Sequence, residues 1–505
     1  MTWLVAVATL LLCPLAAIRW LRVAQREHYH AKSVTRFADR WWTSSPVNTV
    51  LFTVMMLAAL AWLVLVFLTD AAAIAGAVAG VIALVGPIGL GLKGRTAKLS
   101  WTRRMKTTAA VVGALDVLGA AVLRNPVLLA AQPLVVDLAL AVTGPFERKA
   151  GRKWVDSATA KLRSVDPITV AITGSFGKTS TKQYLRHLIT GTRSVLASPA
   201  SFNNTNGLAR TLNEQLNPGT EIFIAEMGTY GPGEIASMCT WVQPDVAALI
   251  NIGPVHLERM KSLDGIVNAK SEIFATARHA VLNVDAHGLA AVADRLEADG
   301  KRVLRASTSD DMSLAVDVRV RRSDRAVFVH GLQVATLPDG PQPDNVACAI
   351  ALALAVDIPV DRIAARLGDL PVPEHRQEVA TSGTGVVVLD NTFSSNPASA
   401  AASLEKLTTL ATKGRRVVVV TPGMVELGKL QFAENQKFGA AAATVATDLV
   451  VVGRTNRAAL LAGATRKRTR VHCVGTRDEA VAWVRSTLAA GDVVLYENDL
   501  PDHFA

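Results

Sequence analysis

The sequence predicts an α/β protein anchored in a membrane, with transmembrane helices at the N-terminus followed by two α/β units. Three observations predict this fold class. Apolar residues make up 50% of the 505 residues, and most of the excess lies before residue 150. Short β-branched runs alternate with helical stretches from residue 168 onward, as parallel βαβ units require. A second series of such runs begins near residue 383 and is typical of a Rossmann-like domain.

These patterns predict three domains. Residues 1–150 form a membrane region with about three to five transmembrane helices. Residues 151–380 form a central α/β domain, and residues 381–505 form a C-terminal α/β domain. We place the boundary between the two α/β domains within residues 371–384, where a proline-rich stretch leads into a glycine-rich one.

The membrane region contains five apolar segments. The second and third are long enough to span a bilayer, whereas the last two are short or interrupted. No basic residue precedes the first segment and arginines follow it, which is the reverse of a secretory signal peptide. We therefore expect this segment to be retained as a helix with its N-terminus outside. The five segments are residues 3–18, 48–69, 71–92, 108–123 and 126–143.

Two basic stretches determine the expected topology. The positive-inside rule places both in the cytoplasm, so the α/β domains are expected at the cytoplasmic face of the cell membrane. The net charge of +11 then indicates a membrane partner and no nucleic acid, because no basic face interleaved with aromatic residues appears later. The first stretch contains Arg19, Arg22, Arg26, Lys32, Arg36 and Arg40. The second contains Lys93, Arg95, Lys98, Arg103, Arg104 and Lys106.

Two acidic residues fall inside the last two apolar segments. Asp116 and Asp137 are either functional, because an acid within a membrane is costly, or close to the membrane interface. Both interpretations stay open at this point. The four cysteines are far apart and form no CxxC pair, so neither a disulfide framework nor a zinc site is indicated.

Runs of β-branched residues predict the strands of the two α/β domains. Parallel strands of this kind place bound ligands at their carboxyl ends. In the central domain the expected strands are residues 167–174, 221–228, 246–253 and 280–285, with a more strand-rich stretch at 303–338. In the C-terminal domain they are residues 386–390, 416–422, 448–453, 470–475 and 493–497.

A glycine-rich loop joins the first central strand to a helix that extends to about Ile189. The loop reads Gly174-Ser175-Phe-Gly177-Lys178-Thr179-Ser180. Glycines let the backbone wrap a phosphate, and the helix N-terminus supplies amide donors. Lys178 would then reach the β- and γ-phosphates and the Thr179 hydroxyl would coordinate Mg²⁺. The loop is two residues shorter than the usual GxxxxGK[ST] pattern, and a glycine turn without function is the alternative.

The short loop GxxGKT[ST] resembles that of the Mur ligases and the related folylpolyglutamate synthetases. Further motifs resemble those of the Mur ligase family in the same order, over about residues 165–500. These motifs are Ser198–Gly207 with Asn203 and Asn204, Glu226-Met-Gly228, Asn251–Glu258 with His256, Ala-Lys270-Ser-Glu, Asn345, His375-Arg376-Gln, Asp390-Asn391-Thr and Pro422–Gly428.

The resemblance implies a role for each of these residues. The nucleotide is bound by Gly174, Ser175, Gly177, Lys178, Thr179, Ser180, Asn345, Arg376, Asp390 and Asn391. Thr179 and Glu226 hold one magnesium ion, and His256 and a carbamylated Lys270 hold a second. Asn203 and Asn204 bind the substrate. The implied catalytic residues are Lys178, Glu226, His256, Lys270 and Arg376.

The same resemblance implies an ATP- and Mg²⁺-dependent, ADP-forming ligase that joins a carboxylate to an amine through an acyl phosphate. It is closest to the members that add D-alanyl-D-alanine in peptidoglycan precursor synthesis, so the expected partner is a small-molecule or a lipid- or nucleotide-linked peptide. The attacking carboxylate and the γ-phosphate are both anions and repel each other. Lys178, Arg376 and magnesium supply the positive charge that such a reaction needs.

Three departures from the family keep other functions open. Membrane segments stand where the family has a domain that binds the UDP-sugar, Asn391 replaces an acid, and the acidic end Glu497–Asp502 replaces a basic Lys-Gly-Ser loop. One alternative is another amide ligase, such as a membrane-bound poly-γ-glutamate synthase. Another is an inactive nucleotide-binding scaffold. A P-loop transporter ATPase is disfavoured, because the sequence contains no signature of that class. Singly, Glu226, His256 and Lys270 are also compatible with ordinary surface positions, but the ordered set argues against a scaffold.

Overall fold

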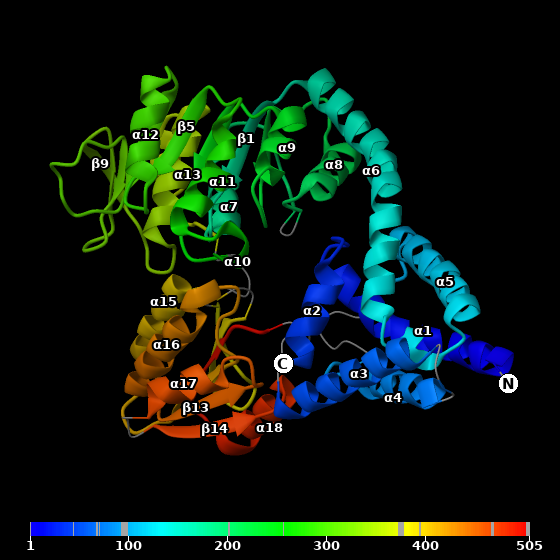
Figure 1. Ribbon diagram of the computed structural model, residues 1–505. Helices are drawn as coiled ribbons and strands as arrows, with labels where there is room; N and C mark the ends of the chain where they lie inside the picture. The colour runs from blue at the N-terminus through cyan, green and yellow to red at the C-terminus, as the bar shows by residue number, and fades with distance from the viewer. Residues whose placement is uncertain are drawn as a thin grey trace. The chain divides into compact units, whose positions relative to one another are not determined.

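The protein is represented by a computed structural model, which describes residues 2–43, 45–66, 69, 71–91, 99–199, 202–255, 257–371, 378–392, 395–465 and 469–500. It divides into two compact units. A helical unit consists mainly of residues up to Gly151, and an α/β unit contains most residues from Arg152 to Asp499 (Figure 1).

The helical unit contains three helices that are long and apolar enough to cross a membrane. They are Trp3–Arg26, Pro46–Leu65 and Arg103–Leu123, with mean hydropathies of 2.1, 2.1 and 1.5. The third apolar segment forms a shorter helix of 15 residues. The elements are α1 (Thr2–Arg26), α2 (Ser33–Trp42), α3 (Pro46–Leu65), α4 (Ala71–Val85), α5 (Arg103–Leu123), the 3₁₀ turn η1 (Pro126–Leu129) and α6 (Gln132–Val165).

The fifth apolar segment differs from the prediction. It does not form one helix over residues 126–143, because the chain first makes the short turn η1. It then enters α6, which continues for 34 residues to Val165 with Pro145 inside it. Proline removes one helical hydrogen bond and usually ends or kinks a helix, yet α6 continues through Pro145.

Helices α1 and α5 run antiparallel, as contacts at both of their ends show. At one end the Arg124 guanidinium lies 4.3 Å from the centre of the Trp3 ring. At the other end the Gln25 amide and the Ser100 backbone exchange two hydrogen bonds of 2.8 Å. The end of α1 that carries Arg26 therefore lies beside the start of α5 with Arg103 and Arg104, as the expected topology requires.

Both buried acids of the helical unit have partners that hold helices in place. The Asp137 carboxylate accepts hydrogen bonds from the backbone N–H groups of Val34 and Thr35, at 3.2 and 2.8 Å, and so caps the N-terminus of α2. Asp116 accepts a hydrogen bond of 2.6 Å from the Gln132 side chain at the start of α6. These contacts favour a structural role for both acids.

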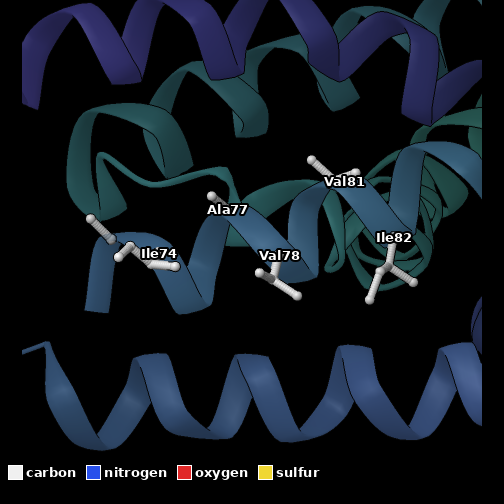
Figure 2. Close-up of a pocket in the computed structure, with 6 residues that line it drawn as sticks. Ile74, Ala77, Val78, Val81 and Ile82 are labelled. Carbon is white, nitrogen blue, oxygen red and sulfur yellow. The ribbon is translucent and has the colours of Figure 1, made fainter. Parts of the chain in front are cut away.

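A cavity of about 500 Å³ lies along α4 (Figure 2). Its lining is entirely apolar, so it offers no group that could bind a nucleotide or polarise a carboxylate. The lining residues are Ala73, Ile74, Ala77, Val78, Val81 and Ile82.

The first sheet of the α/β unit has nine strands in the order β2-β3-β1-β4-β5-β6-β7-β8-β9. Strands β1 to β7 pair in parallel, and β8 and β9 are antiparallel. The four strands predicted before residue 300 are confirmed. The strands are β1 (Ile168–Thr173), β2 (Val195–Ala197), β3 (Ile222–Glu226), β4 (Val246–Leu249), β5 (His279–Asn283), β6 (Arg302–Ser307), β7 (Val318–Val320), β8 (Ala326–Val329) and β9 (Leu332–Thr336).

Two helical layers cover the opposite faces of this sheet, because successive side chains of a strand point to opposite sides. Val170 and Ile172 of β1 belong to the core beneath α7 and α13, whereas Ala171 belongs to the core beneath α8, α9 and α12. The helices are α7 (Lys178–Ile189), α8 (Thr205–Gln215), α9 (Glu234–Val242), α10 (Leu257–Met260), α11 (Leu263–Ser271), η2 (Glu272–Phe274), α12 (Leu289–Ala298), α13 (Pro343–Ala355) and α14 (Val360–Ala365).

The second sheet has the order β10-β11-β15-β12-β13-β14, and only β10 is antiparallel to its neighbour. The five strands predicted here are confirmed. Strand β15 lies between β11 and β12, which places Glu497 beside Asn391. The elements are β10 (Glu378–Thr381), β11 (Val387–Asn391), α15 (Pro397–Leu410), β12 (Val417–Thr421), η3 (Gly428–Leu430), α16 (Gln431–Val445), β13 (Asp448–Val452), α17 (Arg457–Ala464), β14 (Arg470–Val474), α18 (Arg477–Thr487) and β15 (Val493–Glu497).

Candidate active site

The glycine-rich loop lies between the carboxyl end of β1 and the first turn of α7. A side chain at Gly174 would place its Cβ 2.6 Å from the Ile250 side chain. Gly177 has φ +81°, and a Cβ there would lie 2.1 Å from the Asn345 amide oxygen. Both positions therefore require glycine, one for space and one also for its backbone conformation. The N-terminus of α7 is left facing the loop, as a phosphate-binding site needs.

Two side chains of the loop bind its own backbone and the neighbouring β4 loop. The Ser175 hydroxyl accepts a hydrogen bond of 3.0 Å from the Gly253 N–H and donates one of 3.1 Å to the Gly253 carbonyl. The Lys178 ammonium donates to the Gly174 carbonyl at 2.8 Å. Ser175 thus fixes the shape of the loop, and Lys178 stays within it. Ser180 is buried in the first turn of α7.

Glu226 is the centre of the polar cluster. It ends β3, is only 2% exposed, and accepts hydrogen bonds on both carboxylate oxygens. The Thr179 hydroxyl donates to Oε2 at 3.0 Å, and the Asn203 amide donates to Oε1 at 3.3 Å. Three predicted site residues that are far apart in the sequence therefore meet at one carboxylate.

Lys182 is a member of this cluster that the sequence analysis missed. Its ammonium lies 2.8 Å from Glu226 Oε2, and the pair is almost completely buried. Lys182 follows Thr179 by three residues, so both project from the same face of α7. The spacing within Gly-Lys-Thr-Ser-Thr-Lys was the available signal, but only the position of β3 shows which partner that face meets.

Three of the four predicted asparagines lie in the first α/β sheet's domain and have different surroundings. Asn345 is buried at the start of α13 and accepts a hydrogen bond of 3.4 Å from Thr181, close to Gly177. The Asn203 backbone carbonyl accepts from the Gly228 N–H at 2.7 Å, in addition to the amide contact with Glu226. The Asn204 side chain instead caps α8, accepting from the Gly207 N–H at 2.9 Å.

Lys270 lies at the end of α11 and is only 4% exposed. Burial, and then the charge of Lys178, hold the pKa of Lys270 well below its ordinary value. Within the described residues its ammonium has no hydrogen-bond acceptor. An uncharged amine is the form that can react with carbon dioxide, so this environment suits the implied carbamate.

Asp390 and Asn391 lie in the second sheet, at the carboxyl end of β11. The Asp390 carboxylate accepts from the Thr392 N–H at 2.9 Å. The Asn391 amide donates to both oxygens of the buried Glu497, at 3.0 and 2.9 Å, and Ser395 donates to the same carboxylate at 2.5 Å. Burial raises the pKa of Glu497 to about 7, against the opposing effect of these donors.

The donor set at Glu226 fits a magnesium ion. Magnesium prefers oxygen ligands at 2.0–2.1 Å in octahedral geometry, which places adjacent ligands about 2.9 Å apart. The Thr179 and Glu226 oxygens are 3.0 Å apart. In the described part of the chain no group of three His, Cys, Asp or Glu side chains gathers around a metal position. His256 and Arg376 lie outside the described residues.

Comparison with known proteins finds a family and relatives that match most of the α/β unit. The family model for the Mur ligase middle domain matches residues 172–352, and the model for the Mur ligase glutamate ligase domain matches residues 375–496. The UDP-N-acetylmuramoyl-tripeptide--D-alanyl-D-alanine ligase of Mycobacterium bovis is 32% identical over 371 residues, which cover 68% of this chain and 72% of the relative. The enzyme of the same name from Escherichia coli is 28% identical, over 66% of this chain and 74% of the relative.

Solved structures show the same fold. MurF from Acinetobacter baumannii matches with a TM-score of 0.56 and 23% identity, covering 68% of this chain and 75% of that one. MurF ligase from Thermotoga maritima in complex with ADP matches with a TM-score of 0.55 and 24% identity, covering 69% and 80%.

The chain belongs to the Mur ligase family. It is an ATP-dependent ligase of the class that joins an acid to an amino acid. The curated relatives described above share the name of the D-alanyl-D-alanine-adding enzyme, which identifies the branch of the family that this chain resembles.

Proposed function

We propose that this chain joins the carboxylate of the tripeptide in a peptidoglycan precursor to the amine of D-alanyl-D-alanine. The observation that carries the proposal is the convergence of Thr179, Asn203 and Lys182 on Glu226 beside the phosphate-binding loop. The names of the relatives supply the substrates, since UDP-N-acetylmuramoyl-tripeptide and D-alanyl-D-alanine are the ones that those names give.

The residues of the site would act as follows. When bound, ATP with magnesium supplies the γ-phosphoryl group that activates the carboxylate as an acyl phosphate. Lys178 and the α7 N-terminus neutralise the phosphate oxygens, and Thr179 and Glu226 present oxygens to the metal. Asn203 orients Glu226 and would bind the substrate, and Asn345 lies against Gly177 of the phosphate-binding loop. The resemblance adds Arg376 as a further phosphate contact.

Lys270 is proposed as a ligand of a second magnesium ion, together with His256. A protonated lysine cannot bind a cation, whereas a carbamate presents carboxylate-like oxygens. The burial of Lys270 and its lack of a hydrogen-bond acceptor among the described residues support this modification.

The helical unit is proposed to anchor the enzyme in the cell membrane, with the catalytic domains in the cytoplasm. Three helices of the described residues have the required length and hydropathy, and Arg26 of the first basic stretch lies at the same end of α1 and α5 as Arg103 and Arg104 of the second. We accordingly assign residues 1–150 to the membrane region, 151–380 to the central domain and 381–505 to the C-terminal domain.

A second candidate is another amide ligase of the family, such as a membrane-bound poly-γ-glutamate type. The acidic end Glu497–Asp502, which stands where the family has a basic loop, is the departure that keeps this candidate open. A screen of ADP release separates the two. The first proposal expects release that depends on both the UDP-linked tripeptide and D-alanyl-D-alanine. Release driven by glutamate, and not by these two compounds, would reject it.

A further inference from the structure

Glu226 Oε2 accepts hydrogen bonds from a charged donor and from a neutral one. In the structure it accepts from the Lys182 ammonium at 2.8 Å and from the Thr179 hydroxyl at 3.0 Å. The Lys182 and Glu226 side chains are 4% and 3% exposed, so water cannot replace either partner freely. Glu226 is the only acid that Lys182 contacts in the part of the chain that the structure covers. The Lys182 ammonium therefore neutralises the charge of the Glu226 carboxylate at this buried position.

The proposed metal position needs the same oxygen. The 3.0 Å separation that suits magnesium joins Thr179 Oγ1 to Glu226 Oε2, whereas Oε1 contacts the neutral Asn203 amide. A dication and an ammonium that share one carboxylate oxygen would lie within about 5 Å of each other and repel strongly at a site this dry. Both cannot keep their best geometry on Oε2 at once.

We propose that Lys182 is an internal counter-ion that competes with magnesium for Glu226. It neutralises the carboxylate before the nucleotide binds and is displaced from Oε2 when the metal arrives. Lys182 is thus a positioning residue, because its ion pair holds the Glu226 carboxylate beside Thr179 without contacting the reacting atoms. The inference rests on the proposed magnesium site but not on the identity of either ligated substrate.

Binding of Mn²⁺ to the full-length protein without nucleotide, followed by electron paramagnetic resonance of the free ion, tests this competition. Lys182→Met removes the charge at similar side-chain length and should tighten Mn²⁺ binding tenfold or more. Lys182→Arg keeps the charge and should bind close to wild type. Lys301→Met is the matched control, because that ammonium donates to the Ala277 backbone carbonyl at 2.7 Å away from the site. Glu226→Gln should lose the binding in either background.

An unchanged or weaker affinity in Lys182→Met would overturn the competition and leave Lys182 as a structural ion pair only. If that variant does not fold, Lys182→Gln and a wild-type structure with magnesium and ADP decide. The wild-type structure should show Lys182 Nζ more than 4 Å from Oε2, and an intact ion pair beside a bound metal contradicts the proposal. No ligation substrate enters these measurements, so they can fail or succeed independently of the proposed reaction.

Discussion

Lys178 illustrates how single side chains of the loop are used. Its ammonium now binds the Gly174 carbonyl, at the position where an ATP phosphate is expected. Lys178→Ala should therefore lower ATP turnover by about 100-fold or more, because the γ-phosphate loses its charged donor in a site with little water. Steady-state ADP release measures this, with Lys301→Ala as a control that should keep wild-type rates. Wild-type turnover in Lys178→Ala would refute the assignment of the loop.

The Lys270→Ala variant shows whether Lys270 is a metal ligand or an ordinary buried lysine. If it carries a carbamate, Lys270→Ala should still bind ATP but form product about 100-fold more slowly, because charge developing in the reaction loses a metal ion. Millimolar bicarbonate or a small carboxylate should restore part of the rate by filling the vacated ligand position. Ligation rates at saturating ATP, with and without bicarbonate, measure this. An active variant that ignores bicarbonate would remove Lys270 from the mechanism.

The sequence predicted the site residues that lie within one local motif. Gly174, Gly177, Lys178 and Thr179 are recognisable because a phosphate loop needs them at fixed spacing between a strand and a helix. Lys182 was missed because its role depends on Glu226 at the end of β3, which lies 44 residues further along the chain. The contact of Glu497 with Asn391 was missed for the same reason, since only the strand order shows that the two residues are neighbours.

The end of β15 provides a prediction at the scale of elements. Burial raises the pKa of Glu497 from an ordinary 4.5 to about 7. The unfolded chain therefore ionises this group first, and its contribution makes the fold less stable as the pH rises from about 4.5 to about 7. Glu497→Gln should remove this loss and gain on the order of 3 kcal/mol relative to wild type between pH 4.5 and pH 8.

Denaturant unfolding of wild type and Glu497→Gln at the two pH values measures the difference. Glu434→Gln is a suitable control, because its partner Lys437 is exposed and the pair should contribute little at either pH. A wild-type protein that becomes more stable relative to Glu497→Gln as the pH rises would show that Glu497 is held ionised by an unrecognised cation.

Strands were predicted better than helix ends. The buried parallel strands are continuous β-branched runs, and their pattern leaves few alternatives. Strand β2 has only three residues and carries too little pattern to be recognised. Helix α6 continues through Pro145, because the flanking residues favour helix and only one backbone hydrogen bond is lost.

Topology is the prediction that belongs to the whole molecule. A reporter fused after residue 160 should behave as cytoplasmic, because Arg26, Arg103 and Arg104 lie at one end of α1 and α5 and the positive-inside rule keeps that end inside. Paired alkaline phosphatase and fluorescent-protein fusions at this position measure it. Periplasmic phosphatase activity would contradict the proposed location and, with it, access to ATP.

The order of an apolar helical unit followed by an α/β ligase was predictable, because hydropathy and ordered motifs are both properties of sequence. Three of the five apolar segments became long helices, whereas the turn η1 depends on packing against its neighbours. Gly76 and Gly80 of α4 show this, since a Cβ on either would collide with Asn125 or Pro126.

The most direct test of amide ligation through an acyl phosphate is the fate of the carboxylate oxygen. The tripeptide precursor, labelled with ¹⁸O in its reacting carboxylate, is incubated with ATP, magnesium and D-alanyl-D-alanine, and the released phosphate is analysed by mass spectrometry. The carboxylate attacks the γ-phosphorus, and the amine then displaces phosphate from the acyl carbon, so each phosphate should carry one ¹⁸O. The label should appear only with all substrates present and should vanish with Glu226→Gln. Unlabelled phosphate released at the wild-type rate would mean that water is the acceptor, and would contradict a ligase mechanism at this site.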